Sequence, residues 1–181
     1  SGTGSIAWAR GPEGTVRQVG GWGQYLGDEG SGYSIGAEAL RRIMWAEDGR
    51  IGETSMRDTL LQGCGVLGID ELIVWRDTAS KAQIASLAPL VVRWADEGDE
   101  AASQIIDGAV GALTSHVWAA LESPTPRDPS LPLVLWGGLL AEDGPLRSRV
   151  VEAFRGTSVR IAERKLDPAM GAARMALSTL G

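Results

Sequence analysis

The fold of this chain is decided by one stretch: Gly20-Gly21-Trp22-Gly23-Gln24-Tyr25-Leu26-Gly27-Asp28-Glu29-Gly30-Ser31-Gly32-Tyr33. Six of these residues are glycine, which lets the backbone turn sharply and approach a ligand closely. The stretch runs directly into a helical pattern. Asp28 and Glu29 therefore have two interpretations. They cap that helix, or Asp28 accepts hydrogen bonds from ligand hydroxyl groups while Trp22 offers an apolar face to a sugar ring.

Upstream of this stretch, the sequence predicts a tight turn and a β-hairpin. Residues 5–10 and 15–19 are short strand patterns, and the Gly- and Pro-containing residues 11–14 supply the turn between them. Before the hairpin, Gly2-Thr3-Gly4-Ser5 forms a second glycine turn. It is either a plain turn or a phosphate site, in which bare backbone and the Thr3 hydroxyl face phosphate oxygens. Because the chain opens inside this turn, we expect the natural polypeptide to begin upstream of Ser1.

Downstream of the stretch, the pattern is mainly helical. Apolar spacing predicts helices over residues 31–48, 55–67, 82–95 and 100–121, while residues 70–76 form a short element of undetermined type. Pro89 should kink or delay the third of these helices. Asp99 is a natural cap for the fourth.

The last third of the chain returns to an alternation of strands and helices. Residues 123–132 hold four prolines and act as a connector, and residues 133–136 predict a buried strand that ends in Gly137-Gly138. That glycine pair is either a strand-to-helix turn or a surface on which adenine lies flat, since ligands of α/β domains sit at strand carboxyl ends. A helix at 146–154, a strand at 159–162 and a helix at 170–180 complete an α/β domain with a helical insertion.

Composition excludes several classes of function. The net charge is −6 and the basic residues are scattered, which disfavours nucleic-acid binding. No apolar run is long enough for a membrane span. A single cysteine, Cys64, favours a reducing, cytoplasmic compartment and a small buried side chain. The single histidine, His116, flanks the stripe of a helix and is expected to be packed or on the surface. The seven tryptophans are expected in the core and at interfaces.

The order of these motifs resembles the N-acetylglucosamine kinase and BadF/BadG-type ATPase family of the actin–hexokinase–Hsp70 superfamily. The resemblance rests on Gly2–Ser5, on Gly20–Tyr33, on the 84–99 helical region, on the run ending in Gly137-Gly138, and on Asp167-Pro168 with Gly171. It implies a ribonuclease H-like (actin-like ATPase) C-terminal lobe over residues 1–181, with a mixed sheet and a helical insertion at about 31–121. The N-terminal lobe would be absent from this chain.

The resemblance also implies roles for individual residues. Gly2, Thr3, Gly4, Gly137 and Gly138 would bind ATP with Mg²⁺, and no metal ligand is assigned to the chain. For the sugar, the substrate-binding residues would be Thr3, Trp22, Gly23 and Asp28. The family transfers the γ-phosphoryl group of ATP to a sugar hydroxyl, usually O6, between two closing lobes.

Two departures from the family pattern qualify these expectations. The Asp-Gly-Gly phosphate loop and the general-base aspartate belong to the missing lobe, so residues 1–181 alone are predicted to be inactive as a kinase. Ile6 follows the glycine turn where some members carry a sugar-contacting asparagine, which leaves the acceptor sugar open. A BadF/BadG-type ATPase activator of a CoA-ester reductase or dehydratase, or a catalytically lost nucleotide- or sugar-binding regulator, remains the alternative. A homodimer is a further expectation from the family.

Overall fold

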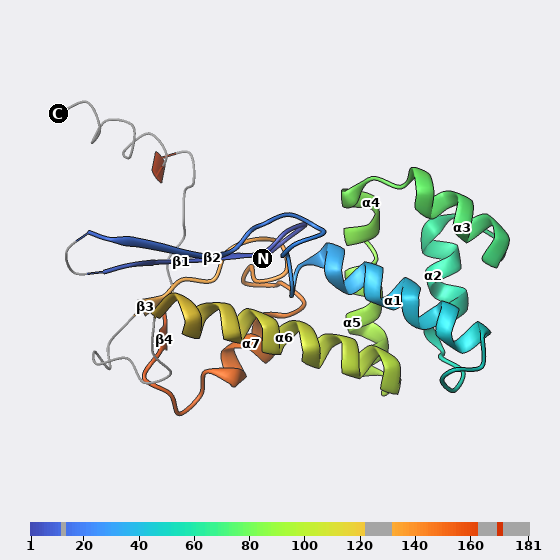
Figure 1. Ribbon diagram of the computed structural model, residues 1–181. Coiled ribbons are helices and arrows are strands. Elements are labelled where there is room, and N and C mark those ends of the chain that lie inside the picture. Colours follow the sequence, from blue (N-terminus) through green and yellow to red (C-terminus); the bar gives the residue numbers. More distant parts are fainter. Residues whose placement is uncertain (12–13, 122–131, 163–169, 172–181) are drawn as a thin grey trace.

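The computed structural model describes residues 1–11, 14–121, 132–162 and 170–171. A β-hairpin, a block of short helices and one long helix are arranged around a loop region near the amino end of the chain (Figure 1). In chain order, the elements are β1 (Ile6–Arg10), β2 (Val16–Gly20), α1 (Gly32–Glu47), α2 (Met56–Cys64), α3 (Ile69–Thr78), α4 (Lys81–Ala85), α5 (Ala88–Asp96), α6 (Glu100–Leu121), β3 (Pro132–Leu133), α7 (Arg147–Ala153) and β4 (Arg160–Ile161).

The predicted hairpin is confirmed. β1 and β2 pair antiparallel, with Ile6 opposite Gly20 and Arg10 opposite Val16. Gly11 N–H donates to the Thr15 carbonyl at 2.8 Å and closes the ladder at the turn. The hairpin packs against α6.

The helix predicted after the glycine loop is also confirmed. The hydroxyl of Ser31 accepts a hydrogen bond from Ser34 N–H, so Ser31 is the amino-terminal cap of α1 rather than Asp28 or Glu29. The helix ends at Glu47, one residue before the Asp48-Gly49 pair that was expected to stop it.

The helical block departs from prediction at its centre. One helix was expected over residues 82–95, and the structure contains two, because Pro89 at the second position of α5 has no N–H to continue the preceding turn. Ser80 and Gln83 cap each other reciprocally at the start of α4. The undetermined element at 70–76 is helical and belongs to α3, and α2 is shorter than predicted because Gly65 ends it in the left-handed conformation.

α4 lies on two glycines of α1. A Cβ atom at Gly36 would stand 2.1 Å from the Ile84 carbonyl oxygen, and one at Gly32 would stand 3.1 Å from that of Ala85. Both distances are below ordinary contact, so the two helices meet through bare backbone. We call this contact, formed by Gly32, Gly36, Ile84 and Ala85, the glycine seam.

The long helix α6 has the predicted bounds and cap. Asp99 Oδ1 accepts the Ala102 N–H at 2.9 Å, and Asp99 Oδ2 accepts from the hydroxyl of Thr54 at 2.9 Å. The cap therefore also fastens the start of α6 to the segment before α2. Within the described residues, no helix is both long and apolar enough to cross a membrane.

The sheet is the main correction to the predicted fold. A single mixed sheet was expected, whereas the described strands form two separate two-stranded sheets, β1–β2 antiparallel and β3–β4 parallel. The strand expected over 133–136 comprises only Pro132–Leu133, with Leu133 to Leu135 half-buried and Trp136 half-exposed. β4 lies within the expected 159–162 segment and α7 within 146–154. The connector at 123–131, the Asp167-Pro168 pair and most of the helix at 170–180 lie outside the described residues.

The core is formed between α1, α2, α5 and α6 and continues to α7. Ile35, Ile43, Leu60 and Ile106 are among its fully buried side chains. The tryptophans were expected in the core and at interfaces. Trp75, Trp94 and Trp118 are half-buried and pack against the core, whereas Trp8, Trp22 and Trp136 are at least half exposed. Large indole rings at the rim leave the centre to aliphatic side chains.

Candidate active site

The site lies where three glycine-containing stretches of the chain meet: the Gly2–Gly4 turn, the loop at residues 20–33 and the Gly137-Gly138 pair. Ser1 N–H donates to the Trp136 carbonyl at 2.6 Å, and the Ser1 hydroxyl donates to the Gly30 carbonyl at 2.8 Å. A Cβ atom at Gly2 would stand 3.6 Å from the Gly138 nitrogen. The stretches, which are separated by up to about 135 residues in sequence, therefore lie in contact.

Glycine is required for this contact at Gly137. The residue has φ +101°, and a Cβ atom there would come within 2.3 Å of the Ser1 carbonyl oxygen. Any side chain would push the Gly2–Gly4 turn away from the end of β3.

The Gly2–Gly4 turn is also fixed to the start of α1. The Gly32 N–H donates to the Gly2 carbonyl at 2.7 Å and the Tyr33 N–H to the Thr3 carbonyl at 3.4 Å. Two free N–H groups at the helix start are thereby satisfied by the turn. The Thr3 side chain stays exposed.

Asp28 occupies the centre of the site. Its side chain is 6% exposed, and it is the non-glycine residue with positive φ, 137°, in the described chain. Such a backbone conformation costs on the order of 1–3 kcal/mol and has to be compensated by its surroundings. The Glu29 carboxylate accepts the Asp28 N–H at 3.1 Å, which contributes to that compensation.

Both carboxylate oxygens of Asp28 are partnered. Oδ1 accepts the Ser5 N–H at 3.2 Å, next to the Gly2–Gly4 turn. Oδ2 pairs with Lys81 Nζ at 2.5 Å, and Lys81 comes from the first turn of α4. The carboxylate thus joins the turn, the glycine loop and the helical block.

Sequence reasoning missed Lys81. It lies 53 residues from Asp28 in the chain, and no local pattern distinguishes it from a solvated surface lysine. It also missed Ser5, whose hydroxyl donates to the Glu29 carbonyl at 2.6 Å. The tight Gly4–Asp28 approach, 2.9 Å from a Cβ atom at Gly4 to Oδ1, gave no sequence signal beyond the glycine itself.

His116 is packed, as expected, and it contacts the glycine loop. Its ring lies about 3.1 Å from where a Cβ atom of Gly20 would be, and its Nε2 lies 3.5 Å from the Glu29 carboxylate. Its Nδ1 is buried without a hydrogen-bond partner among the described residues. His116 therefore links the end of β2 to the residue that supports Asp28.

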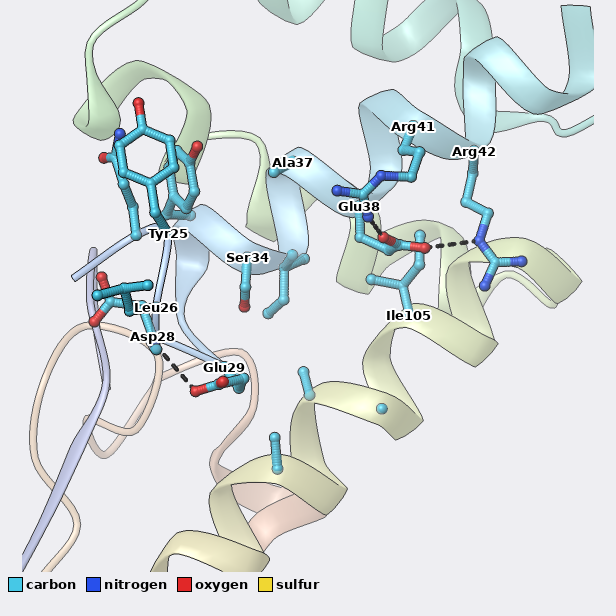
Figure 2. A pocket seen from close by; sticks show the side chains of 18 of the residues that line it. Tyr25, Leu26, Asp28, Glu29, Ser34, Ala37, Glu38, Arg41, Arg42 and Ile105 are labelled. Carbon is cyan, nitrogen blue, oxygen red and sulfur yellow. Dashed lines mark hydrogen bonds and ion pairs between the residues drawn. The ribbon is translucent and has the colours of Figure 1, made fainter. Parts of the chain in front are cut away.

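A pocket of about 780 Å³ opens beside the glycine loop, between α1 and α6. Figure 2 shows Asp28, Glu29, Tyr25 and Leu26 at one end of it, and the ion pairs of Glu38 with Arg41 and Arg42 at the other. This volume is within the usual range of roughly 300–1,000 Å³ for small-molecule sites.

Trp22 and Gly23 lie at the edge of this arrangement. The Trp22 side chain is 65% exposed and packs on Gly27, and residues 24–30 line the pocket instead. Tyr25 and Leu26, at 85% and 81% exposure, present the apolar surface nearest the pocket.

Cys64 is buried in α2, as predicted. Burial raises the pKa of its thiol to about 11. The thiolate that nucleophilic or metal-binding chemistry requires is therefore disfavoured at neutral pH.

Two curated proteins similar to this chain are sugar kinases by name. The chain is 33% identical over 186 residues to the N-acetyl-D-glucosamine kinase of Dictyostelium discoideum and 32% identical over 182 residues to the N-acetylmuramic acid/N-acetylglucosamine kinase of Clostridium acetobutylicum, in each case with 98% of the chain aligned. It spans 58% and 60% of the lengths of these two relatives.

A solved structure agrees with these relatives. It is the crystal structure of a protein from Chromobacterium violaceum provisionally named N-acetylglucosamine kinase, which is 33% identical, with a TM-score of 0.71 over 90% of this chain and 53% of that one. The family model of the BadF/BadG/BcrA/BcrD ATPase family matches residues 1–176. The chain belongs to the BadF/BadG/BcrA/BcrD ATPase family.

Proposed function

We propose that this chain is the C-terminal lobe of an ATP-dependent sugar kinase, with residues 31–121 as its helical insertion. In this proposal, the whole protein phosphorylates N-acetylglucosamine or a related amino sugar at a hydroxyl group, O6. The observation that carries the proposal is the contact of the Gly2–Gly4 turn with both Asp28 and the Gly137-Gly138 pair. The substrate class is supported by the two curated relatives, which are named as kinases of N-acetylglucosamine.

The Gly2–Gly4 turn is assigned to the phosphates of ATP. Its backbone is bare, and the exposed Thr3 hydroxyl can donate to a phosphate oxygen. Gly137 and Gly138 are assigned to the adenosine, because a flat ring can approach backbone that carries no side chains. In phosphoryl transfer, the protein acts mainly by positioning the reacting groups and stabilising charge, which is what rigid backbone contacts provide.

Asp28 is assigned to the sugar. Each oxygen of an ionised carboxylate can accept about two hydrogen bonds, and in this structure each oxygen has one described partner. The remaining acceptor positions suit the hydroxyl groups of a hexose at the adjoining end of the pocket. Trp22 and Gly23 are assigned to the same subsite, with Trp22 as an apolar surface for the sugar ring.

Magnesium is assigned to the nucleotide. In the parts of the chain that the structure describes, no three His, Cys, Asp or Glu side chains cluster closely enough to hold a metal ion. Mg²⁺ commonly binds through substrate phosphates and a few carboxylates, so in this proposal it arrives with ATP and no residue of this chain is named as its ligand.

The catalytic base is assigned to the N-terminal lobe, together with an Asp-Gly-Gly phosphate loop. Residues 1–181 alone are therefore expected to bind ligands weakly and to have no kinase activity. We also propose a cytoplasmic location, on the single cysteine, and a homodimer of the whole protein.

Two measurements test this proposal. Calorimetry with residues 1–181 should detect N-acetylglucosamine binding that Asp28→Asn abolishes, and Mg-ADP binding that Asp28→Asn leaves in place. A coupled assay should show ATP turnover with N-acetylglucosamine only for the protein that carries its N-terminal lobe. Turnover by residues 1–181, or sugar affinity unaffected by Asp28→Asn, would contradict the assignments.

The alternative within the family is an ATPase activator of a CoA-ester reductase or dehydratase. Such activators hold an iron–sulfur cluster, which requires several thiolates. This chain contributes one cysteine, buried and with a raised pKa, so the kinase is the better supported proposal. A regulator that binds nucleotide or sugar without catalysis would show the same binding with no turnover in the whole protein.

A further inference from the structure

Lys81 reaches the sugar subsite, the end of the pocket beside Asp28, from the first residue of α4. Its Nζ lies 2.5 Å from Asp28 Oδ2. We propose that Lys81 is a specificity-determining residue: its charge cancels that of Asp28, and the subsite therefore favours uncharged sugars over sugars that carry an ammonium group. This inference rests on the proposed function, because it takes Asp28 as a residue that contacts the sugar.

The charged groups around the pocket balance only when Lys81 is included. The charged side chains among its described lining residues are Asp28, Glu29, Glu38, Arg41 and Arg42. Together they carry a net charge of −1, and the ammonium of Lys81 on Asp28 brings the total to zero. His116 faces Glu29 from α6, with Nε2 3.5 Å from the carboxylate, and is counted as neutral. A ligand in the pocket therefore meets no net charge.

Each end of the pocket has its own ion pairs. At the far end, Glu38 pairs with both Arg41 and Arg42. At the loop end, Glu29 is 59% exposed, so water and salt screen its carboxylate. The Asp28 side chain is 6% exposed and is not screened in this way, so its charge needs a partner in the protein. Lys81 supplies that partner.

Stability alone does not account for a lysine at this position. A cation in the first turn of a helix is opposed by the helix dipole, and α4 has no acidic residue in its first turn to offset it. A buried ion pair also adds little net stability, because the cost of removing two charges from water offsets their attraction. A residue that breaks a local rule in this way is expected at a functional site.

The position of the Lys81 side chain is set by α4. Ser80 and Gln83 cap the start of this helix reciprocally, and Ile84 and Ala85 lie on the glycine seam. Figure 1 shows α4 packed beside α1. The ammonium is therefore held beside Asp28 by a fixed backbone as well as by its ion pair.

The chemical consequence is a choice between sugars. Asp28 paired with Lys81 can still accept hydrogen bonds from sugar hydroxyl groups, but it offers no unbalanced negative charge to a cation. A sugar ammonium would lose hydration in the pocket without gaining a counter-ion, and Lys81 would repel it. Charges act over about 8–10 Å at moderate salt, which exceeds the size of a hexose ring, so the repulsion does not depend on which hydroxyl Asp28 contacts.

Three sugars and the charge-removing variant Lys81→Met test the inference. Glucose and glucosamine differ by one group, a hydroxyl in the first and an ammonium in the second, and N-acetylglucosamine carries an uncharged amide at the same carbon. Calorimetry at pH 7 with residues 1–181 should show that the unmodified chain binds the two uncharged sugars more tightly than glucosamine. In Lys81→Met, the affinity for glucosamine relative to glucose should rise at least about tenfold, because the charge of Asp28 is left unbalanced.

Matched variants separate the effect of charge from that of structure. Lys81→Gln also removes the charge but keeps an N–H donor for Asp28, so it provides the same comparison if Lys81→Met folds poorly. Lys81→Arg keeps the charge and should keep the preference of the unmodified chain. Arg93→Met removes an exposed cation of α5 that does not line the pocket, and it should leave the ratio unchanged.

The outcomes distinguish this inference from the proposed function. If both neutral variants weaken all three sugars by the same factor, Lys81 has a structural role only and the inference is wrong, while the sugar kinase proposal stands. An unmodified chain that binds glucosamine as tightly as glucose overturns the inference in the same way. If no sugar binds, or if Asp28→Asn leaves N-acetylglucosamine binding intact, the assignment of Asp28 to the sugar fails and this inference fails with it.

Discussion

Removal of the Lys81 ammonium tests how Asp28 is held. Lys81→Met keeps an unbranched chain of similar length but leaves the Asp28 carboxylate, 6% exposed, without its cation. Breaking a fully buried pair costs about 3–5 kcal/mol. Because Lys81 is itself 33% exposed, water can replace part of the interaction, and we expect a loss of about 2 kcal/mol in the free energy of unfolding.

The reverse substitution should cost less. Asp28→Asn leaves a lysine that can reach solvent and keeps an oxygen for the Ser5 N–H, so about 1 kcal/mol is expected. In the double variant, neither charge remains, and the total loss should be smaller than the sum of the single losses by about 1 kcal/mol.

Urea unfolding at pH 7 and 25 °C gives the free energy of unfolding of the parent chain, the two single variants and the double variant. For a chain of this size, the Lys81→Met loss corresponds to a fall in Tm of about 4–8 °C. Arg93→Met is the matched control, since Arg93 and Glu97 are about half exposed and such pairs contribute less than about 1 kcal/mol. If Lys81→Met is no worse than Arg93→Met, or if the single losses add without coupling, the ion pair does not hold Asp28.

Three further perturbations address other parts of the structure. Gly137→Ala forces a Cβ atom into backbone at positive φ and should lower the free energy of unfolding by at least about 2 kcal/mol. Gly108→Ala, in open space on α6, should raise it by about 0.5–1 kcal/mol in the same urea unfolding assay. At pH 8, Cys64 should react with a chromogenic disulfide about 100-fold more slowly than an ordinary cysteine thiol, because its pKa of about 11 lies two units above the ordinary value of 9.0; rapid reaction in the folded protein would contradict this. Trp22→Ala should weaken N-acetylglucosamine binding about tenfold if its ring stacks on the sugar, with Trp8→Ala as an exposed control; an unchanged affinity by calorimetry would remove Trp22 from the subsite.

Local patterns in the sequence predicted the local structure well. The hairpin, α1 and α6 each have a periodic apolar pattern and a recognisable turn or cap, and their bounds are confirmed within one or two residues. The sequence predicted that Pro89 would kink or delay one helix over residues 82–95, whereas the structure contains two helices. The segment before Pro89 forms its own short helix, α4, which packs on α1. A continuous apolar run after the connector predicted a longer buried strand than the structure contains.

The candidate site was predictable only in its backbone. Glycines mark close approaches, so the meeting of Gly2, Asp28 and Gly137 could be expected from the three motifs. Lys81 could not, because a single lysine on a helix resembles any exposed charge until the fold brings it to a buried carboxylate. The two-sheet arrangement was equally hidden, since pairing between distant strands leaves no periodic signal in either one.

The glycine seam limits how this protein can be recombined with its relatives. If α4 came from a relative with a different backbone path, it would either clash with Gly32 and Gly36 or leave a cavity above them. Because Lys81 lies on α4, its ion pair with Asp28 would be lost as well. A chimera should therefore exchange residues 20–96 as one cassette, with the loop, α1 and α4 from the same parent. Crossovers inside that cassette are the ones expected to give insoluble protein.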